Sequence, residues 1–234
     1  MTRPSAPDTS RHLFEGPDGW RLAPEGAAVH LGERTAVIAD VHLGYEWARS
    51  ARGDHLPAHS LVETRAKLAR LLDRAAIDRL VVAGDMVESS RPCRRTAEDV
   101  HLLARWLADR GVQLVGLAGN HDPRRLPALP ETCGVAGWTV SHGHRTLDVP
   151  RLISGHLHPA LRAGGRTAPC FLVGPSRIVL PAFSPDAAGW DVAAGALPPG
   201  LHIESLRCIA GAGGELLDFG PLSALRRKFA ALRR

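Results

Sequence analysis

The sequence of 234 residues predicts an α/β fold in which two β-sheets pack face to face and helices cover their outer faces, an αββα sandwich. Up to about residue 118, short apolar runs alternate with amphipathic helical stretches. Beyond residue 137 the helical pattern fades, and short apolar segments separated by Gly and Pro indicate further strands. Residues that can bind metals directly follow several apolar runs, which predicts an active site at the C-terminal ends of the strands.

The first sheet is expected to contain the apolar runs 35–39, 80–83 and 113–118, which have the length of buried strands. Helical stretches separate them, so right-handed crossovers should give a largely parallel sheet. We expect residues 1–26, which are rich in Pro, Gly and charge, to form a partly loose N-terminal segment. Residues 27–234 should then form a single domain, which is large enough to bury a full core.

Two helices of this half are predicted from their caps and apolar faces. Ser60 and Glu63 match a capping box at the start of the first helix. Thr96 is expected to cap the second helix, which should end near Arg110. Leucine and valine residues at helical spacing give each helix an inner face: Leu61, Leu68, Leu71 and Leu72 in the first, and Val100, Leu103 and Leu107 in the second.

The second sheet is predicted from four short apolar segments: 138–142, 151–154, 169–173 and 177–180. The chain then ends in an amphipathic helix over residues 222–232. Its apolar face consists of Leu222, Leu225, Phe229 and Leu232. We expect this helix to pack back onto the domain, with a dimer or nucleic-acid contact as the alternative. The sequence leaves the oligomeric state open.

Composition places the chain among ordinary globular proteins, with 44% hydrophobic and 23% charged residues. No apolar run approaches the roughly 20 residues of a membrane-spanning helix, and the N-terminus has no apolar signal region, so we expect a cytoplasmic protein. Cys93, Cys133, Cys170 and Cys208 are far apart, which argues against a zinc knuckle or a disulfide framework. The net charge of +5 is compatible with a polyanionic substrate, although the basic C-terminal tail contributes to it.

Five loops that follow apolar runs carry the residues of greatest chemical interest. They are Asp40-Val41-His42, Gly84-Asp85, Gly119-Asn120-His121-Asp122, His142-Gly143-His144 and Gly155-His156-Leu157-His158. Each motif alone has an ordinary explanation as a turn or a hydrogen-bonded histidine. The set does not, because five separate strand ends would have to acquire such residues by accident.

The chemistry of this set favours metal ions. Carboxylate and amide oxygens together with imidazole nitrogens suit Mn²⁺, Fe²⁺ or Zn²⁺, and no thiolate takes part. Two such ions about 3.5–4 Å apart can hold a phosphate and generate a hydroxide that attacks it. A bridging carboxylate keeps two ions this close, and Asp85 is the natural candidate. The glycines of these loops allow the backbone to approach closely.

The five loops resemble, in order, the D-x-H, G-D, G-N-H-[DE], H-G-H and G-H-x-H motifs of the calcineurin-like metallophosphoesterases. The resemblance covers about residues 33–185 and implies a hydrolase with two metal ions, for which we favour Mn²⁺ over Fe²⁺ or Zn²⁺. It implies one ion on Asp40, His42 and His158, with Asp85 as the bridge. The second ion would bind to Asn120, His142 and His156.

The same resemblance implies that His121 is the catalytic acid and that Asp122 orients it. It places His144 outside the metal sites, at the rim or against the substrate. The strings Ile38–Glu46, Gly155–Pro159 and Leu180–Phe183 look like those of the small SbcD-related phosphoesterases. That group includes the DNA-ligase-associated enzyme PdeM, so it implies action on DNA phosphodiesters and a functional link to a DNA ligase and a helicase.

Several residues near the predicted site are candidates for substrate contacts. Five arginines follow the metal-binding loops and either grip phosphates or are solvated loop charges: Arg91, Arg94, Arg95, Arg124 and Arg125. Tyr45, Trp47 and Phe183 lie near the predicted mouth and could stack on bases, although packing is the better explanation for the last two.

Three functions remain open from sequence. The first is a DNA-directed phosphodiesterase, a nuclease associated with repair. The second is an enzyme for small phosphoesters such as cyclic nucleotides. A non-catalytic binding scaffold is the third, and the full set of ligand residues argues against it.

Overall fold

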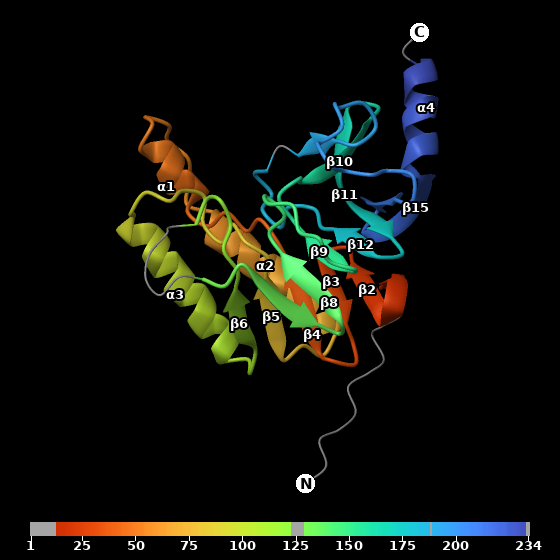
Figure 1. Cartoon of the computed structure of the whole chain (residues 1–234). Helices are drawn as coiled ribbons and strands as arrows, with labels where there is room; N and C mark the ends of the chain where they lie inside the picture. The colour runs from red at the N-terminus through yellow and green to blue at the C-terminus, as the bar shows by residue number, and fades with distance from the viewer. Residues whose placement is uncertain (1–12, 123–128, 188, 233–234) are drawn as a thin grey trace.

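The computed structural model describes residues 13–122, 129–187 and 189–232, which form two β-sheets lying face to face (Figure 1). The first sheet has six strands in the order β1-β2-β3-β4-β5-β6. Strands β4, β5 and β6 are parallel, and β1 to β4 pair antiparallel. Their bounds are β1 Phe14–Glu15, β2 Trp20–Ala23, β3 Ala27–His30, β4 Thr35–Ile38, β5 Arg79–Val82 and β6 Gln113–Gly116.

The second sheet has nine strands, with the path β13-β10-β11-β12-β9-β8-β7; β14 pairs with β11, and β15 pairs with β14. Parallel pairs join β8 to β9 and β9 to β12, so this sheet is mixed, as the sequence predicts. The bounds are β7 Thr132–Val135, β8 Trp138–Ser141, β9 Leu152–Ser154, β10 Pro159–Ala163, β11 Arg166–Gly174, β12 Arg177–Val179, β13 Trp190–Asp191, β14 Arg207–Ala212 and β15 Glu215–Pro221.

Helices cover the outer faces of the two sheets (Figure 1). They are α1 Tyr45–Ser50, α2 Ser60–Arg74, α3 Arg94–Ala108 and α4 Leu222–Leu232, with a short 3-10 turn at Pro17–Gly19. The chain follows the predicted order of β4, α2, β5, α3 and β6, which confirms the parallel half of the fold. None of the described helices is long and apolar enough to cross a membrane.

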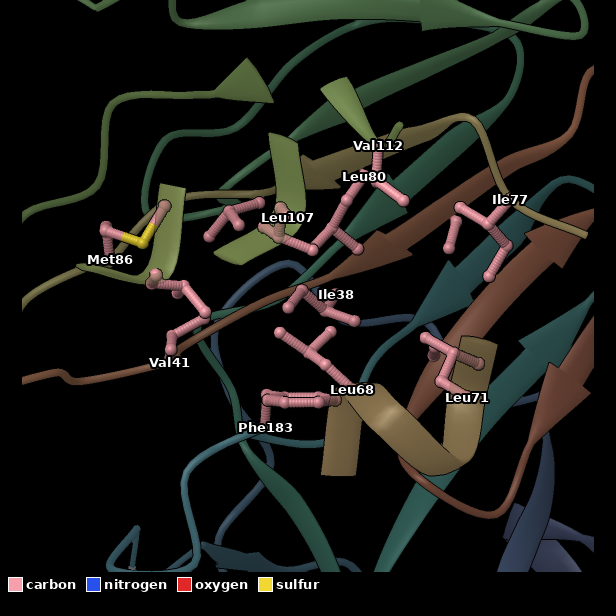
Figure 2. Packing of buried hydrophobic residues seen from close by; sticks show 14 of the residues in the cluster. Ile38, Val41, Leu68, Leu71, Ile77, Leu80, Met86, Leu107, Val112 and Phe183 are labelled. Carbon is pink, nitrogen blue, oxygen red and sulfur yellow. The ribbon is translucent and has the colours of Figure 1, made fainter. Parts of the chain in front are cut away.

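Successive side chains of the first sheet point to opposite faces, so its strands contribute to two hydrophobic cores. Ile38 and Leu80 point toward α2 and α3, where they pack against Leu68 and Leu107 (Figure 2). Val37 points to the opposite face and packs against the second sheet. Successive strand residues point to opposite faces, so a run that is apolar throughout becomes a strand buried on both sides. The site loops therefore begin at strand ends that are held from both faces.

Two strands form within the N-terminal segment that was expected to be partly loose. Strands β1 and β2 lie before residue 27 and extend the first sheet. Trp20 is fully buried and its ring lies 6.5 Å, between centroids, from that of Trp138 in the second sheet. Residues 13–26 therefore belong to the same fold as the residues that follow. Residues 1–12 lie outside the described part.

Both predicted helix caps are wrong. Ser60 is the first residue of α2, and its Oγ accepts the backbone N–H of Gly44 at 3.0 Å instead of capping the helix. Helix α3 begins two residues before Thr96, with Cys93 at the cap position. Thr96 packs closely against Gly44, where a Cβ atom would overlap its side chain. Both side chains thus contact the loop after β4, Ser60 by a hydrogen bond and Thr96 by packing.

The C-terminal helix packs back onto the domain through its first turns. Leu222 and Leu225 are buried against the outer face of the second sheet, whereas Leu232 is 82% exposed.

The four cysteines are free thiols, as predicted.

Candidate metal centre

The predicted site loops share an unusual backbone conformation. Eight non-glycine residues of the described chain have positive φ angles, and five of these are predicted metal ligands. The five are Asp40 (57°), His42 (53°), Asp85 (50°), His156 (69°) and His158 (44°). A non-glycine residue in this left-handed region costs free energy, on the order of 1–3 kcal/mol each. The surrounding packing therefore holds the site in a conformation that these residues would not adopt alone.

Asp40 lies at the centre of the site and is fully buried. Its Oδ1 is 3.0 Å from His142 Nε2 and 3.1 Å from His158 Nε2. Its Oδ2 accepts the backbone N–H of His156 at 2.9 Å. One carboxylate thus joins the loops that follow β4, β8 and β9. A buried carboxylate needs such partners, or a cation, to offset the loss of hydration.

Asp85 faces the same space from the loop after β5. Its Oδ2 lies 3.3 Å from His142 Nε2, and its Oδ1 accepts the backbone N–H of His121 at 2.8 Å. Its carbonyl oxygen accepts the backbone N–H groups of Val41 and His42 at 2.9 and 3.1 Å. Asp85 and Asp40 thus both contact Nε2 of His142, while the bridging role of Asp85 stays a prediction.

Hydrogen bonds and burial oppose each other in setting the protonation of this cluster. Burial acts to raise the pKa of Asp40 and Asp85, but the hydrogen bonds from His142 hold both pKa values below their usual range, assisted at Asp40 by His158. Burial acts to lower the pKa of His142, yet the two carboxylates raise it to about 9. Burial and the nearby His142 lower the pKa of His144 and His156. The carboxylates therefore stay ionised, as metal ligands must.

Three groups of potential ligands among the described residues lie close enough to hold a cation, and two of them consist only of predicted ligands. Asp40, His42 and His158 form one group, and Asp40, Asp85 and His142 form the other, with ligand atoms within 4.8 Å of one another in each. Nε2 of His42 is buried and has no hydrogen-bond partner among the described residues. An unpartnered buried imidazole nitrogen beside a buried carboxylate fits a divalent cation, which would satisfy both.

The remaining predicted ligands surround these groups. The ring of His156 lies 4.9 Å, between centroids, from that of His142. Asn120 lies in the same loop as His121, with its side chain exposed. Their assignment to the second ion stays a prediction. Nδ1 of His144 lies 3.0 Å from Nδ1 of His142, so His144 contacts a predicted ligand directly. Its expected position at the rim or against the substrate stays a prediction.

The structure corrects the role expected for Asp122. Its carboxylate accepts backbone N–H groups of Asp85, Gly119 and Val87 at 2.9, 2.9 and 3.3 Å. Burial raises its pKa, with a contribution from the charge of Asp85. The ring of His121 is held elsewhere, with Nδ1 2.7 Å from the carbonyl oxygen of Glu88. Asp122 therefore fixes the loops and not the ring.

Sequence reasoning missed Glu88 altogether. Its Oε2 lies 2.9 Å from Nδ1 of His42, so this residue contacts two of the predicted site histidines. A single glutamate in a loop three residues after Asp85 belongs to no periodic pattern and to none of the five motifs. Glu88 is recognised only in the folded structure, where its loop lies beside the loops of His42 and His121.

The predicted substrate-contact residues lie in different surroundings. Arg91 and Arg94 line a cavity of about 490 Å³ beside the loop after β5. The guanidinium of Arg95 lies 4.8 Å from the ring centre of Trp47, so this pair is engaged in packing. Phe183 is fully buried and cannot stack on a base. Arg124 and Arg125 lie outside the described residues.

Tyr45 begins α1, and its half-buried ring lies 6.4 Å, between centroids, from that of His59. This contact holds the aromatic side chain against the start of α2. Its predicted contact with substrate stays a prediction.

Comparison with known proteins agrees with this geometry. The chain is similar to two archaeal proteins named DNA double-strand break repair protein Mre11. The Methanopyrus kandleri protein is 34% identical over 95 residues, which are 39% of this chain and 20% of that protein. The Halobacterium salinarum protein is 32% identical over 126 residues, which are 52% of this chain and 29% of that protein. The chain thus matches less than a third of either relative.

A solved structure shares the fold. The crystal structure of Pseudomonas putida nuclease MPE superposes with a TM-score of 0.68, over 88% of this chain and 98% of that chain, at 21% sequence identity. The model of the calcineurin-like phosphoesterase family matches residues 33–154, which include four of the five site loops. The chain therefore belongs to the calcineurin-like phosphoesterases.

Proposed function

We propose that this protein is a metal-dependent phosphodiesterase that carries two divalent ions and cleaves DNA. The observation that carries the proposal is the convergence of carboxylate and imidazole groups from separate loops around the buried Asp40. The relatives are named for DNA double-strand break repair, and a structure of the same fold is titled a nuclease. These names favour DNA over small phosphoesters as the substrate.

The family motifs imply which residues would hold the metals, and the ligand groups around Asp40 support part of that set. Asp40, His42 and His158 would bind one ion, and Asn120, His142 and His156 the other, with Asp85 shared between them. When bound, two such ions supply an activated water and neutralise the charge of the phosphate. Mixed carboxylate and imidazole donors without thiolate suit Mn²⁺, Fe²⁺ or Zn²⁺, and we favour Mn²⁺ among them.

His121 is placed to supply a proton to the leaving oxygen. A carbonyl oxygen only accepts hydrogen bonds, so Nδ1 of His121 must carry a hydrogen where it faces the carbonyl of Glu88. This contact fixes the ring and leaves Nε2 free to donate the second proton of the imidazolium. The backbone N–H of His121 donates to Asp85, which ties the acid to the proposed bridging ligand.

The decisive experiment is a parallel assay of chelator-stripped protein reloaded with Mn²⁺. The substrates are single-stranded DNA, duplex DNA, cyclic nucleotides and nitrophenyl diesters. We expect Mn²⁺-dependent cleavage of DNA. Turnover of small diesters with no cleavage of DNA would reject the DNA assignment and favour the small-phosphoester alternative. Hydrolysis of none of these substrates would leave the binding-scaffold alternative.

Two variants separate the catalytic and structural assignments in this assay. His121→Ala should abolish turnover while metal content, measured by elemental analysis, stays at the wild-type level. Asp85→Ala should lose both ions, and retention of two ions per chain would contradict its bridging role. The link to a DNA ligase and a helicase stays a prediction, which the neighbouring genes in the genome of origin would test.

A further inference from the structure

Glu88 joins three loops of the site. Its backbone N–H donates to the carbonyl oxygen of Leu43 at 3.0 Å, beside the D-x-H loop. Its carbonyl oxygen lies 2.7 Å from Nδ1 of His121. Its carboxylate Oε2 lies 2.9 Å from Nδ1 of His42, with 22% of the Glu88 side chain exposed.

The carboxylate of Glu88 determines which nitrogen of His42 is available to a cation. A carboxylate accepts a hydrogen at Nδ1, so a neutral His42 then presents the lone pair of Nε2. Both ring nitrogens of His42 are buried and have no hydrogen-bond partner among the described residues. Nδ1 is the nitrogen that lies beside the Glu88 carboxylate, and His42 groups with Asp40 and His158. In metal sites, a carboxylate on the far nitrogen of a histidine ligand fixes its tautomer and ring orientation.

We propose that Glu88 is a positioning residue that orients His42 through its carboxylate and His121 through its carbonyl oxygen. This inference rests on the proposed function, because it assigns Glu88 to the same metal centre. It couples the ligand of one ion to the proton donor through a single residue. Any movement of the loop after Asp85 would then displace both groups together.

The competing explanation is that Glu88 is itself a ligand. His42, Glu88 and His121 also lie within 4.8 Å of one another and could hold a cation among them. A neutral imidazole binds a metal through one nitrogen only, so His42 cannot serve this group through Nδ1 and also ligate beside Asp40 through Nε2. Stoichiometry therefore distinguishes the two arrangements.

The test is a calorimetric titration of Mn²⁺ into the chelator-stripped full chain. Glu88→Ala should bind two ions, one at wild-type affinity and one about 10- to 100-fold more weakly. Glu88→Gln should show a smaller loss, because its amide oxygen can still accept from Nδ1. Glu215→Gln, an exposed glutamate on β15, is the matched control and should bind as the wild type does. Rising Mn²⁺ should restore most of the turnover of Glu88→Ala.

Three outcomes would overturn the assignment. Wild-type affinity at both sites in Glu88→Ala shows that the carboxylate positions nothing. Loss of one ion even at saturating Mn²⁺ shows that Glu88 is a ligand. Equal weakening at both sites, with a lower melting temperature in chelator, shows a general structural role. Failure of the proposed function looks different: the wild type would bind two ions, the Glu88 variants would shift one, and no diester would be cleaved.

Discussion

The carboxylate of Asp122 accepts the backbone N–H of Asp85 through Oδ2 at 2.9 Å. The same oxygen accepts the N–H of Gly119, and Oδ1 accepts that of Val87. One buried side chain therefore ties the loop after β6 to the loop after β5, and it places the proposed bridging ligand beside the proposed acid.

Asp122→Ala should destabilise the protein even without metal. The substitution leaves three backbone N–H groups without their acceptor, and an unsatisfied buried group costs about 1–3 kcal/mol. We expect the free energy of unfolding, measured by urea denaturation in chelator, to fall by at least about 2 kcal/mol. Asp109→Ala, at an exposed position after α3, is the control and should change it little. Equal stability of the two variants would show that the carboxylate does not hold the loops.

Gly119→Ala should disturb Asp85 directly. A Cβ atom at this glycine would overlap Oδ1 and the backbone nitrogen of Asp85. Such overpacking costs about 1–3 kcal/mol, and here it displaces the proposed bridge, so Mn²⁺ affinity should fall together with stability. Gly134→Ala is the matched control, because a Cβ there meets nothing within 4 Å. Unchanged Mn²⁺ binding in Gly119→Ala would show that Asp85 tolerates displacement.

His59 should make stability depend on pH. Its Nδ1 lies 2.9 Å from the carbonyl oxygen of Pro57 and its Nε2 2.9 Å from Oδ2 of Asp186, and these acceptors, the carbonyl first, raise its pKa above 6.5. The folded state therefore binds the proton more tightly than the unfolded state does. The stabilisation is complete below pH 6.5 and is lost as the pH rises through the folded pKa.

Denaturation of His59→Asn and the wild type over this pH range measures the effect. The difference in unfolding free energy between them should shrink as the pH rises. Asp186→Asn should reduce the pH dependence in part, because the carbonyl of Pro57 remains. A difference that grows with pH would mean that the folded pKa is lowered instead.

Arg91→Ala should weaken DNA binding in a salt-dependent manner. Arg91 lines the cavity beside the loop after β5 and is exposed. Removing one phosphate contact should lower the slope of log affinity against log salt by about 0.7 for single-stranded DNA. Arg70→Ala, at an exposed position on α2, should leave the slope unchanged. Identical slopes for the two variants, measured by fluorescence anisotropy, would remove Arg91 from the DNA contacts.

The parallel half of the fold was predictable because β4 and β5 are buried on both faces and have continuous apolar sequences. Eight strands were missed, because they are short or because Gly, Pro and charged residues interrupt their patterns: β1, β2, β3, β7, β10, β13, β14 and β15. The caps were wrong because Ser60 and Thr96 contact the loop at Gly44, and no local pattern encodes such a contact.

The site loops were predictable because ligand residues recur after several strands. The groups that position these residues were not. Glu88 and Asp122 contact residues of other loops, and these contacts exist only in the folded chain. No local sequence pattern predicts them.

The positive φ angles of the five predicted ligands set a limit on how this protein can be made more robust. Glycine at His42 or His158 would relax the backbone there but delete a side chain that the proposed chemistry needs. Heat resistance and hydrolysis therefore oppose each other at these positions. A library of variants selected for thermal stability alone would accumulate glycine in these loops. The selected proteins would be more stable but inactive.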